Sequence, residues 1–339
     1  PPAMSDQAGQ VRHVELGEIL GGRIAEAEII ETPTSTLFFA GDRVFKLRRP
    51  VHLGYADLRD RREREIACLR EVERNRPLAP DVYLGVVDLR DAAGTLLDHM
   101  VVMRRLPWER RLSTLVSLGE PVDGWLRAVA AALADFHAGR ASGGEASGRT
   151  PAEISRRGEP AAVEESWLAA LEGLEPCRDT LLDPESVDEA ERLAMRFLAG
   201  HGPLFEERVR RGRIRDGHGD LTAEHVYCLD DGPRIIHRVE FDQRLRVGDV
   251  LSDAGTLAGD LELLGHPEAG ERFLAWYGEY SGQDPPPELV HLYIAYRAVA
   301  RAGAACAEDR RGDPTAAERA RRLLETALEH LRAAHRCAA

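Results

Sequence analysis

Acidic and histidine side chains are concentrated in residues 218–253 of this 339-residue chain. The tripeptide His-Gly-Asp at 218–220 precedes one short apolar run, and Glu240 and Asp242 follow the next. A carboxylate can act as a general base, and neighbouring carboxylates can hold a divalent cation. Phosphoryl transfer needs both functions. The segment therefore predicts a site of phosphoryl transfer, with solvated acidic turns as the plainer alternative.

Two predicted strands position these groups. The apolar runs 226–229 and 234–239 are separated by Asp-Asp-Gly-Pro at 230–233, which is typical of a turn. We therefore expect a β-hairpin. The outer ends of an antiparallel hairpin lie side by side, so the hairpin would bring Asp220 close to Glu240.

Lys46 is the only lysine among the 45 basic residues. Lysine carries a compact charge on a slim stem, whereas arginine presents a planar fork. In a chain that otherwise uses arginine, a retained lysine indicates a task that arginine cannot perform, unless it was retained by chance. Asn75 is likewise the only asparagine, which limits the choice of amide ligands for a metal.

The elements around Lys46 are predicted to form a small antiparallel sheet. Its first three strands are expected at 27–31, 37–39 and 43–47. The turn 32–36 is rich in hydroxyls, including those of Thr34 and Ser35. Such a turn can cradle phosphates through hydroxyl and backbone N–H groups, although it has no glycine-rich signature.

A charged helix is expected at 56–75, and its glutamates are potential partners of Lys46. Further strands at 82–87 and 100–103 precede a break at 104–107. The rest is predicted to be mainly helical, at 126–137, 161–174, 186–211, 249–264 and 267–335. The sequence thus predicts an α+β, two-lobed protein with a sheet lobe at 11–105 and a helical lobe at 106–339, which carries the catalytic hairpin 218–242.

Composition limits the class of protein. A net charge of −13 argues against binding to nucleic acid or a membrane surface, and 43% hydrophobic residues provide for a substantial core. Five scattered cysteines without a CxxC pair indicate reduced thiols. No signal-peptide pattern or long apolar run is evident, so we expect a cytoplasmic protein.

The motifs also carry a family resemblance. HGDL at 218–221, VEFD at 239–242 and the upstream Lys46 resemble the aminoglycoside phosphotransferase family, which has a protein-kinase-like fold. An uncharacterised bacterial branch, sometimes fused to a P-loop ATPase module, is more similar still. Segments such as VFKLRRPV and NRPLAPDVYLGVV carry this similarity, which spans about 28–265. The fused module has no counterpart here, because Lys46 follows Phe45 and no Walker A motif exists.

The resemblance implies roles for individual residues. Asp220 would be the base that faces the acceptor hydroxyl. Lys46 would bind the α- and β-phosphates and be held by a helix glutamate, with Glu71 favoured over Glu65. Met103 would lie beside the adenine.

The same resemblance places residues around the catalytic loop. Glu240 stands where the family has a metal-binding aspartate. Asp249, also a possible helix N-cap, would brace the loop, and His218 would support it. His225 replaces the family's asparagine metal ligand. Because Mg²⁺ prefers oxygen ligands and imidazole suits softer metals, the metal could instead be held by Glu224, Glu240 or Asp242, or be Mn²⁺.

The leading hypothesis is therefore a kinase that transfers the γ-phosphoryl group of ATP, with Mg²⁺, to a small hydroxylated molecule. An aminoglycoside or other antibiotic, in an antibiotic-resistance role, or a sugar would be the acceptor. One alternative is a nucleotide-binding regulator with little catalysis, which His225 and Glu240 favour. Another is a metal hydrolase with His218, Asp220 and His225 as ligands. The acceptor, the choice between ATP and GTP, and the oligomeric state stay open.

Overall fold

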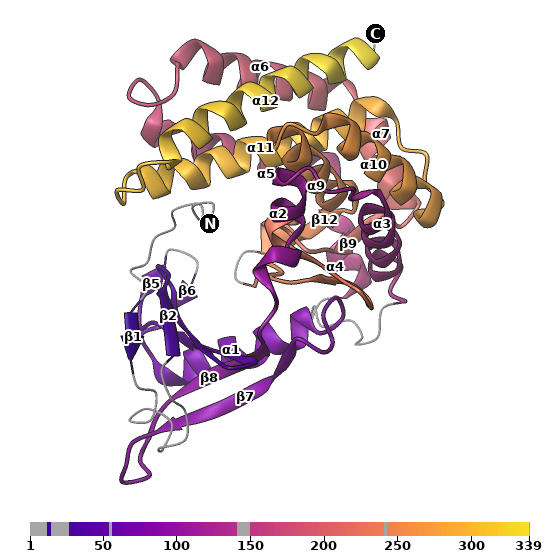
Figure 1. Ribbon diagram of the computed structural model, residues 1–339. Coiled ribbons are helices and arrows are strands. Elements are labelled where there is room, and N and C mark those ends of the chain that lie inside the picture. Colours follow the sequence, from indigo (N-terminus) through magenta and orange to yellow (C-terminus); the bar gives the residue numbers. More distant parts are fainter. Residues whose placement is uncertain (1–11, 15–26, 54–55, 141–149, 241–242, 339) are drawn as a thin grey trace.

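The computed structural model describes residues 12–14, 27–53, 56–140, 150–240 and 243–338. These residues form two lobes, a sheet with one long helix and a larger, mainly helical lobe (Figure 1). The α+β, two-lobed architecture predicted from the sequence is confirmed. None of the described helices is both long enough and apolar enough to cross a membrane.

The sheet of the first lobe has six antiparallel strands in the order β1-β2-β3-β4-β8-β7. Their bounds are Arg12–Val14 (β1), Ala27–Glu31 (β2), Ser35–Ala40 (β3), Arg43–Arg48 (β4), Tyr83–Arg90 (β7) and Leu96–Arg104 (β8). Burial alternates along β4, so Val44, Lys46 and Arg48 are buried and share one face. Two charged side chains on an inward face need buried counter-charges.

Those counter-charges come from α1 (Arg61–Asn75), which packs against β8. The helix begins later than the predicted residue 56, because the Asp60 carboxylate caps it by accepting from the N–H groups of Arg62 and Glu63. Residues Ala56–Asp57 instead form a short strand, β6, paired with β5 (His52–Leu53). Cys68, Glu71 and Val72 lie on the buried side of α1.

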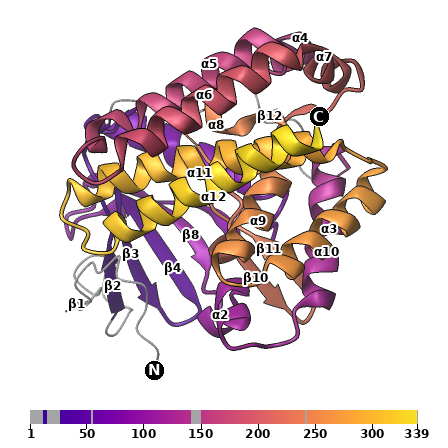
Figure 2. The same ribbon diagram turned by 90° about the horizontal axis from the view of Figure 1, so that it is seen from above.

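The helical lobe surrounds one extensive hydrophobic cluster that includes Trp167, Leu257 and Val299. Its α-helices are α2 (Leu112–Ser117), α3 (Asp123–His137), α4 (Pro151–Arg156), α5 (Pro160–Glu172), α6 (Pro184–Gly200), α7 (Gly202–Arg210), α8 (Gln243–Arg246), α9 (Leu251–Leu263), α10 (Pro267–Ser281), α11 (Pro287–Asp309) and α12 (Ala316–Cys337). The long pair α11 and α12 lies side by side across this lobe (Figures 1 and 2). The single helix predicted at 186–211 is two helices, because the chain breaks at His201 before Pro203.

The predicted hairpin exists but is shorter than expected. Strand β10 (Val226–Leu229) pairs with β11 (Gly232–Ile235), and Leu229 lies opposite Gly232, so the turn has only two residues. The prediction that the second strand extends to residue 239 is wrong. His237 adopts a left-handed φ of 64°, which turns the chain out of the extended conformation. A second pair, β9 (Ile214–Asp216) with β12 (Val247–Asp249), brackets the segment that carries Asp220.

Candidate active site

The loop that carries Asp220 runs from β9 to a short 3₁₀ helix, η3 (Ala223–His225). Gly219 in this loop has a φ of 90°, and a Cβ atom there would lie 3.0 Å from the side chain of Val239 and 3.1 Å from Cα of Arg246. Glycine is therefore required at this position for both backbone conformation and space. The tight turn presents the Asp220 side chain, which is 36% exposed.

Asp253 of α9 holds this loop from below. Its carboxylate accepts from the N–H groups of His218 at 2.6 Å and Gly219 at 2.8 Å, and His137 Nε2 lies 3.0 Å away. The prediction that Asp249 braces the loop is wrong. Asp249 binds Arg208 through two hydrogen bonds of 2.7 and 2.6 Å, and also accepts from the N–H of Leu251.

His218 supports the loop from within, as predicted. The N–H of Asp220 donates to its Nδ1 at 3.2 Å, so the proton is on Nε2, which donates to the carbonyl oxygen of Ile236 at 2.8 Å. Burial lowers the pKa of His218 to about 4, and the ring is neutral at neutral pH. A neutral imidazole ring with both nitrogens in hydrogen bonds to the backbone has a structural role and does not donate a proton in the reaction.

The free energy of unfolding of the protein should consequently fall as the pH becomes acidic. Burial lowers the pKa of His218 to about 4, so the unfolded chain, in which histidine has its ordinary pKa near 6.5, binds this proton first. The contribution of His218 is complete above pH 6.5 and is lost as the pH falls toward 4. For His218 alone the free energy of unfolding should fall by about 3 kcal/mol over this interval.

Urea unfolding at pH values between 7 and 4 would measure this loss. His218→Gln is the matched variant, because glutamine does not titrate in this interval. Its stability should depend less steeply on pH than that of the wild type. A free energy of unfolding that stays constant from pH 7 to 4 would contradict the prediction.

Asp220 lies beside cations from distant helices. Burial by itself would raise its pKa, but His225, Arg297 and Arg301 outweigh burial and lower it. Arg297 Nη2 lies 3.5 Å from Asp220 Oδ1 and donates to the carbonyl oxygen of Gly219. The carboxylate is therefore ionised at neutral pH and able to accept a proton from a hydroxyl group. Arg297 acts as a positioning residue that fastens the loop to α11.

Lys46 and Glu71 form the ion pair expected between β4 and α1, with Nζ 2.7 Å from Oε1. Glu71 is fully buried. Burial would raise its pKa, but the charges of Lys46 and Arg48 lower it to about 2. Glu65, the second choice, lies instead beside His99, at 3.7 Å. The structure thus selects Glu71 as the partner of the lone lysine.

Sequence reasoning overlooked Arg48, which extends this network across the lobes. Its Nη2 donates to Glu71 Oε2 at 2.6 Å and also to Glu240 Oε2. Burial and the adjacent charge of Glu71 raise the pKa of Glu240 to about 7. Arg48 lies two residues after Lys46 and so on the same face of β4, a periodicity that could have identified it.

The metal site predicted at His225, Glu240 and Asp242 is not complete among the described residues. Glu240 is engaged by Arg48, and Nδ1 of His225 donates to the carbonyl oxygen of Asp220 at 2.8 Å. Asp242 lies outside the described residues. Within the described part of the chain, no group of three His, Cys, Asp or Glu side chains is arranged to hold a metal ion.

The residues predicted to contact the nucleotide all belong to the sheet lobe, with Ser35 and Met103 opposite the two ends of β4. Ser35 is buried in β3, and its Oγ has no hydrogen-bond partner among the described residues, whereas Thr34 in the turn is half-buried. The carbonyl oxygen of Thr34 accepts from the N–H of Arg49 at 2.9 Å. Met103 lies near the end of β8, paired with Val44, where the chain leaves the sheet. A nucleotide-binding role for these three residues stays a prediction.

Comparison with solved structures defines the fold class. A choline/ethanolamine kinase family protein from Mesorhizobium loti aligns with a TM-score of 0.52 and 16% identity over 94% of this chain and 97% of its own. The GDP and kanamycin complex of APH(2")-IIia gives 0.52 and 17% over 95% and 97%. Spectinomycin phosphotransferase APH(9)-Ia, with ADP and spectinomycin, gives 0.50 and 12% over 94% and 96%. The chain has the protein-kinase-like fold of aminoglycoside phosphotransferases.

Sequence comparison finds nearer relatives. Uncharacterised proteins of Mycobacterium tuberculosis and Mycobacterium bovis are 39% identical over 304 residues, which is 90% of this chain. The chain spans 59% of the length of these curated relatives. No protein-family model matches the chain.

Proposed function

We propose that this protein is a phosphotransferase that moves the γ-phosphoryl group of ATP to a hydroxyl of a small molecule. Two observations carry the proposal, one from each lobe. A buried Lys46–Glu71 pair offers one ammonium to phosphates, and an ionised Asp220 stands on a loop whose backbone is hydrogen-bonded to Asp253. Positioning and charge neutralisation are the main requirements of phosphoryl transfer.

The proposed acceptor is a hydroxylated small molecule, either an antibiotic such as an aminoglycoside or a sugar. The solved structures that share this fold are those of a phosphotransferase bound to kanamycin, a spectinomycin phosphotransferase and a choline/ethanolamine kinase family protein. The direct test is ADP release from ATP across a panel of aminoglycosides, nucleoside antibiotics and sugars, with Mg²⁺ and separately with Mn²⁺. Release that depends on one acceptor would support a kinase and name its substrate class.

A nucleotide-binding regulator with little catalysis is the second candidate. The specific observation in its favour is that Arg48 engages Glu240, the carboxylate that corresponds to the metal-binding position. His225 in the place of an asparagine points the same way. A regulator would bind ATP, detected as a raised melting temperature, but would release no ADP with any acceptor.

Nucleotide affinity should depend on the identity of the lone lysine. Lys46→Arg keeps the charge but replaces a compact ammonium with a planar fork in a buried site beside Glu71. Losing a charge-assisted hydrogen bond costs about 1.5–3 kcal/mol, so ATP affinity should fall roughly 10- to 100-fold.

Isothermal titration calorimetry with ATP measures this effect, and Lys46→Met is the companion variant that removes the charge. It should lose at least as much affinity as Lys46→Arg. Wild-type affinity in both variants would show that the lysine does not contact the nucleotide.

A further inference from the structure

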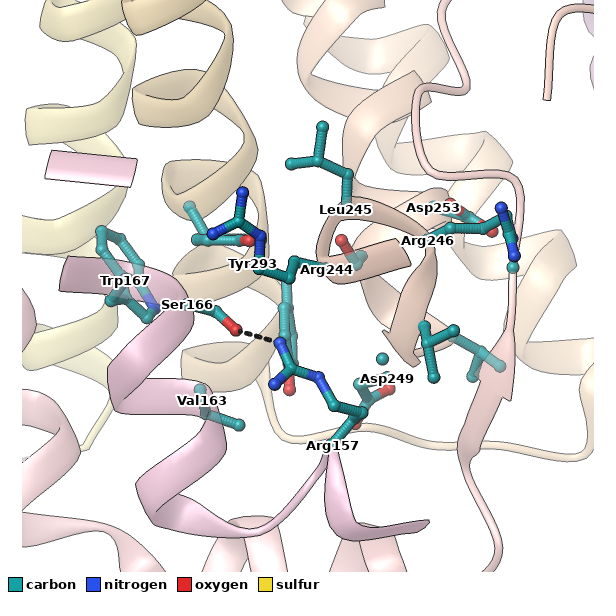
Figure 3. Close-up of a pocket in the computed structure, with 16 residues that line it drawn as sticks. Arg157, Val163, Ser166, Trp167, Arg244, Leu245, Arg246, Asp249, Asp253 and Tyr293 are labelled. Atoms are coloured by element: carbon teal, nitrogen blue, oxygen red, sulfur yellow. Dashed lines mark hydrogen bonds between the residues drawn. The ribbon is translucent and has the colours of Figure 1, made fainter. Parts of the chain in front are cut away.

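A cavity of about 530 Å³, part of which is open to solvent, lies in the helical lobe beside the base of the catalytic loop. Helix α5 forms one wall and α11 another, and the segment from α8 through β12 closes the third side (Figure 3). Asp220 is not among its lining residues. The cavity is therefore separate from the group proposed to act as the base.

The two carboxylates at this cavity, those of Asp249 and Asp253, are already bound by protein donors. Asp249 is fully buried and binds the Arg208 guanidinium through both oxygens. Asp253 accepts two backbone N–H groups of the catalytic loop and contacts His137. A cationic ligand would have to compete with these protein partners for both side chains.

Two hydrogen-bond donors at the cavity, the Trp167 N–H and the Tyr293 hydroxyl, are candidates to bind a ligand. Trp167 is completely buried, and its Nε1 has no hydrogen-bond partner among the described residues. Tyr293 is 5% exposed, and this residue also lines the cavity. An unsatisfied buried donor costs about 1–3 kcal/mol, so the Trp167 N–H favours a ligand that supplies an acceptor oxygen, and the Tyr293 hydroxyl can donate to the same ligand.

Arg157 adds a positive charge to the same wall. Its guanidinium donates to Ser166 Oγ at 3.1 Å, a contact drawn in Figure 3, and lies 3.3 Å from the exposed carboxylate of Glu165. The Arg157 side chain is 20% exposed, so solvent screens its pair with Glu165 only partly. An anionic group in the cavity could share this guanidinium.

The remaining walls are aromatic and aliphatic. The Tyr296 ring lies 5.5 Å from that of Trp167, and Val163 and Leu245 line the cavity beside them. Such walls contact carbon rather than polar atoms. We propose that the cavity binds a small organic anion, with carboxylate oxygens on the donors of Arg157, Trp167 and Tyr293 and its carbon skeleton on these walls.

The cavity is also coupled to the loop that carries Asp220. Gly217 lines it, and a Cβ atom at that position would lie 2.4 Å from Asp253 Oδ2, the carboxylate that holds the loop. A ligand in the cavity therefore contacts the support of the loop rather than the loop's reacting group. Binding does not depend on the proposed phosphotransferase activity and is tested without ATP.

The experiment is isothermal titration calorimetry on the full chain with small organic probes that differ in charge or in size. Benzoate carries the carboxylate, and benzyl alcohol and benzylamine carry a neutral and a cationic group on a similar ring. Acetate and phenylacetate vary the size of the carbon skeleton. We expect saturable binding of at least one carboxylate, at least tenfold tighter than that of benzyl alcohol or benzylamine.

Two conservative variants locate the site. Tyr293→Phe removes one oxygen and Trp167→Phe removes the indole N–H, and each should weaken carboxylate binding roughly tenfold. Tyr280→Phe is the control, because Tyr280 is a surface residue hydrogen-bonded to Arg127 and lies outside the cavity. Circular dichroism and the melting temperature verify folding, and Tyr293→Phe remains informative if Trp167→Phe does not fold.

Absence of carboxylate binding across the panel would overturn the proposal. So would equal affinity for benzylamine, or carboxylate binding that is unchanged in a folded Tyr293→Phe protein. Quenching of tryptophan fluorescence by the bound carboxylate, lost in Trp167→Phe, would support it independently of calorimetry.

Discussion

Asp220→Asn should abolish most turnover while ATP still binds. The substitution keeps the shape of the side chain but removes the carboxylate that would accept the proton of the attacking hydroxyl. A positioned base contributes about 10²- to 10⁴-fold to the rate, so turnover should fall by that factor. Nucleotide affinity should change less than about twofold, because Lys46 and Glu71 belong to the other lobe.

ADP release with the identified acceptor, together with calorimetric titration of ATP, measures both quantities. Asp284→Asn is the control, since it makes the same substitution at an exposed carboxylate in the connection between α10 and α11. The pH profile adds a second readout. The lowered pKa of Asp220 keeps the base ionised throughout pH 5–8, so this group should cause no loss of kcat/KM within that interval. Full turnover in Asp220→Asn would exclude the proposed base.

Arg48→Met should destabilise the protein by about 3–5 kcal/mol. Arg48 is 2% exposed and donates to both Glu71 and Glu240, so its removal leaves a buried network with one positive charge for two carboxylates. Breaking a buried ion pair from one side is costly, because the remaining charge has lost its partner.

The penalty should diminish as the pH falls. The pKa of Glu240 is raised to about 7, so below this pH the carboxyl becomes protonated and needs no counter-charge. The double variant Arg48→Met, Glu240→Gln should likewise be more stable at pH 8 than Arg48→Met alone. Urea unfolding at pH 8 and pH 6 gives these free energies.

Arg49→Met is the matched control, because Arg49 is exposed and donates to the carbonyl oxygen of Thr32. An equal cost for the Arg48 and Arg49 variants would mean that the cross-lobe network contributes no stability. The Arg48 variant also separates the two candidate functions. If Arg48 restrains Glu240 from a catalytic role, Arg48→Lys should increase ADP release, whereas a regulator would stay inactive.

Local patterns in the sequence predicted much of the fold. Alternating burial along β4 and the apolar spacing of α1 follow from the two-residue and 3.6-residue periods of strands and helices. These periods are properties of short segments, so the sheet lobe, the helical lobe and the facing of Lys46 toward a helix glutamate could be inferred. The choice of Glu71 over Glu65 also fits a helix whose buried face carries Cys68 and Val72.

The length of the second hairpin strand could not be predicted from local sequence. The sequence Arg-Ile-Ile-His-Arg-Val has the composition of a long strand, yet β11 ends at Ile235. His237 takes a left-handed φ, and its N–H donates to the Tyr83 hydroxyl of the other lobe at 3.2 Å. A contact between lobes overrode a local strand preference, and propensity alone contains no such information.

The sequence by itself determined the fold class, the lone lysine with its glutamate and the loop that carries Asp220, because each depends on residue type and short spacing. Only the tertiary structure decided which distant groups meet them. Asp249 and Asp253 are only four residues apart, and packing alone made the second the support of the loop. Arg297 and the donors of the α5–α11 cavity come from helices far along the chain, and their positions follow from long-range packing.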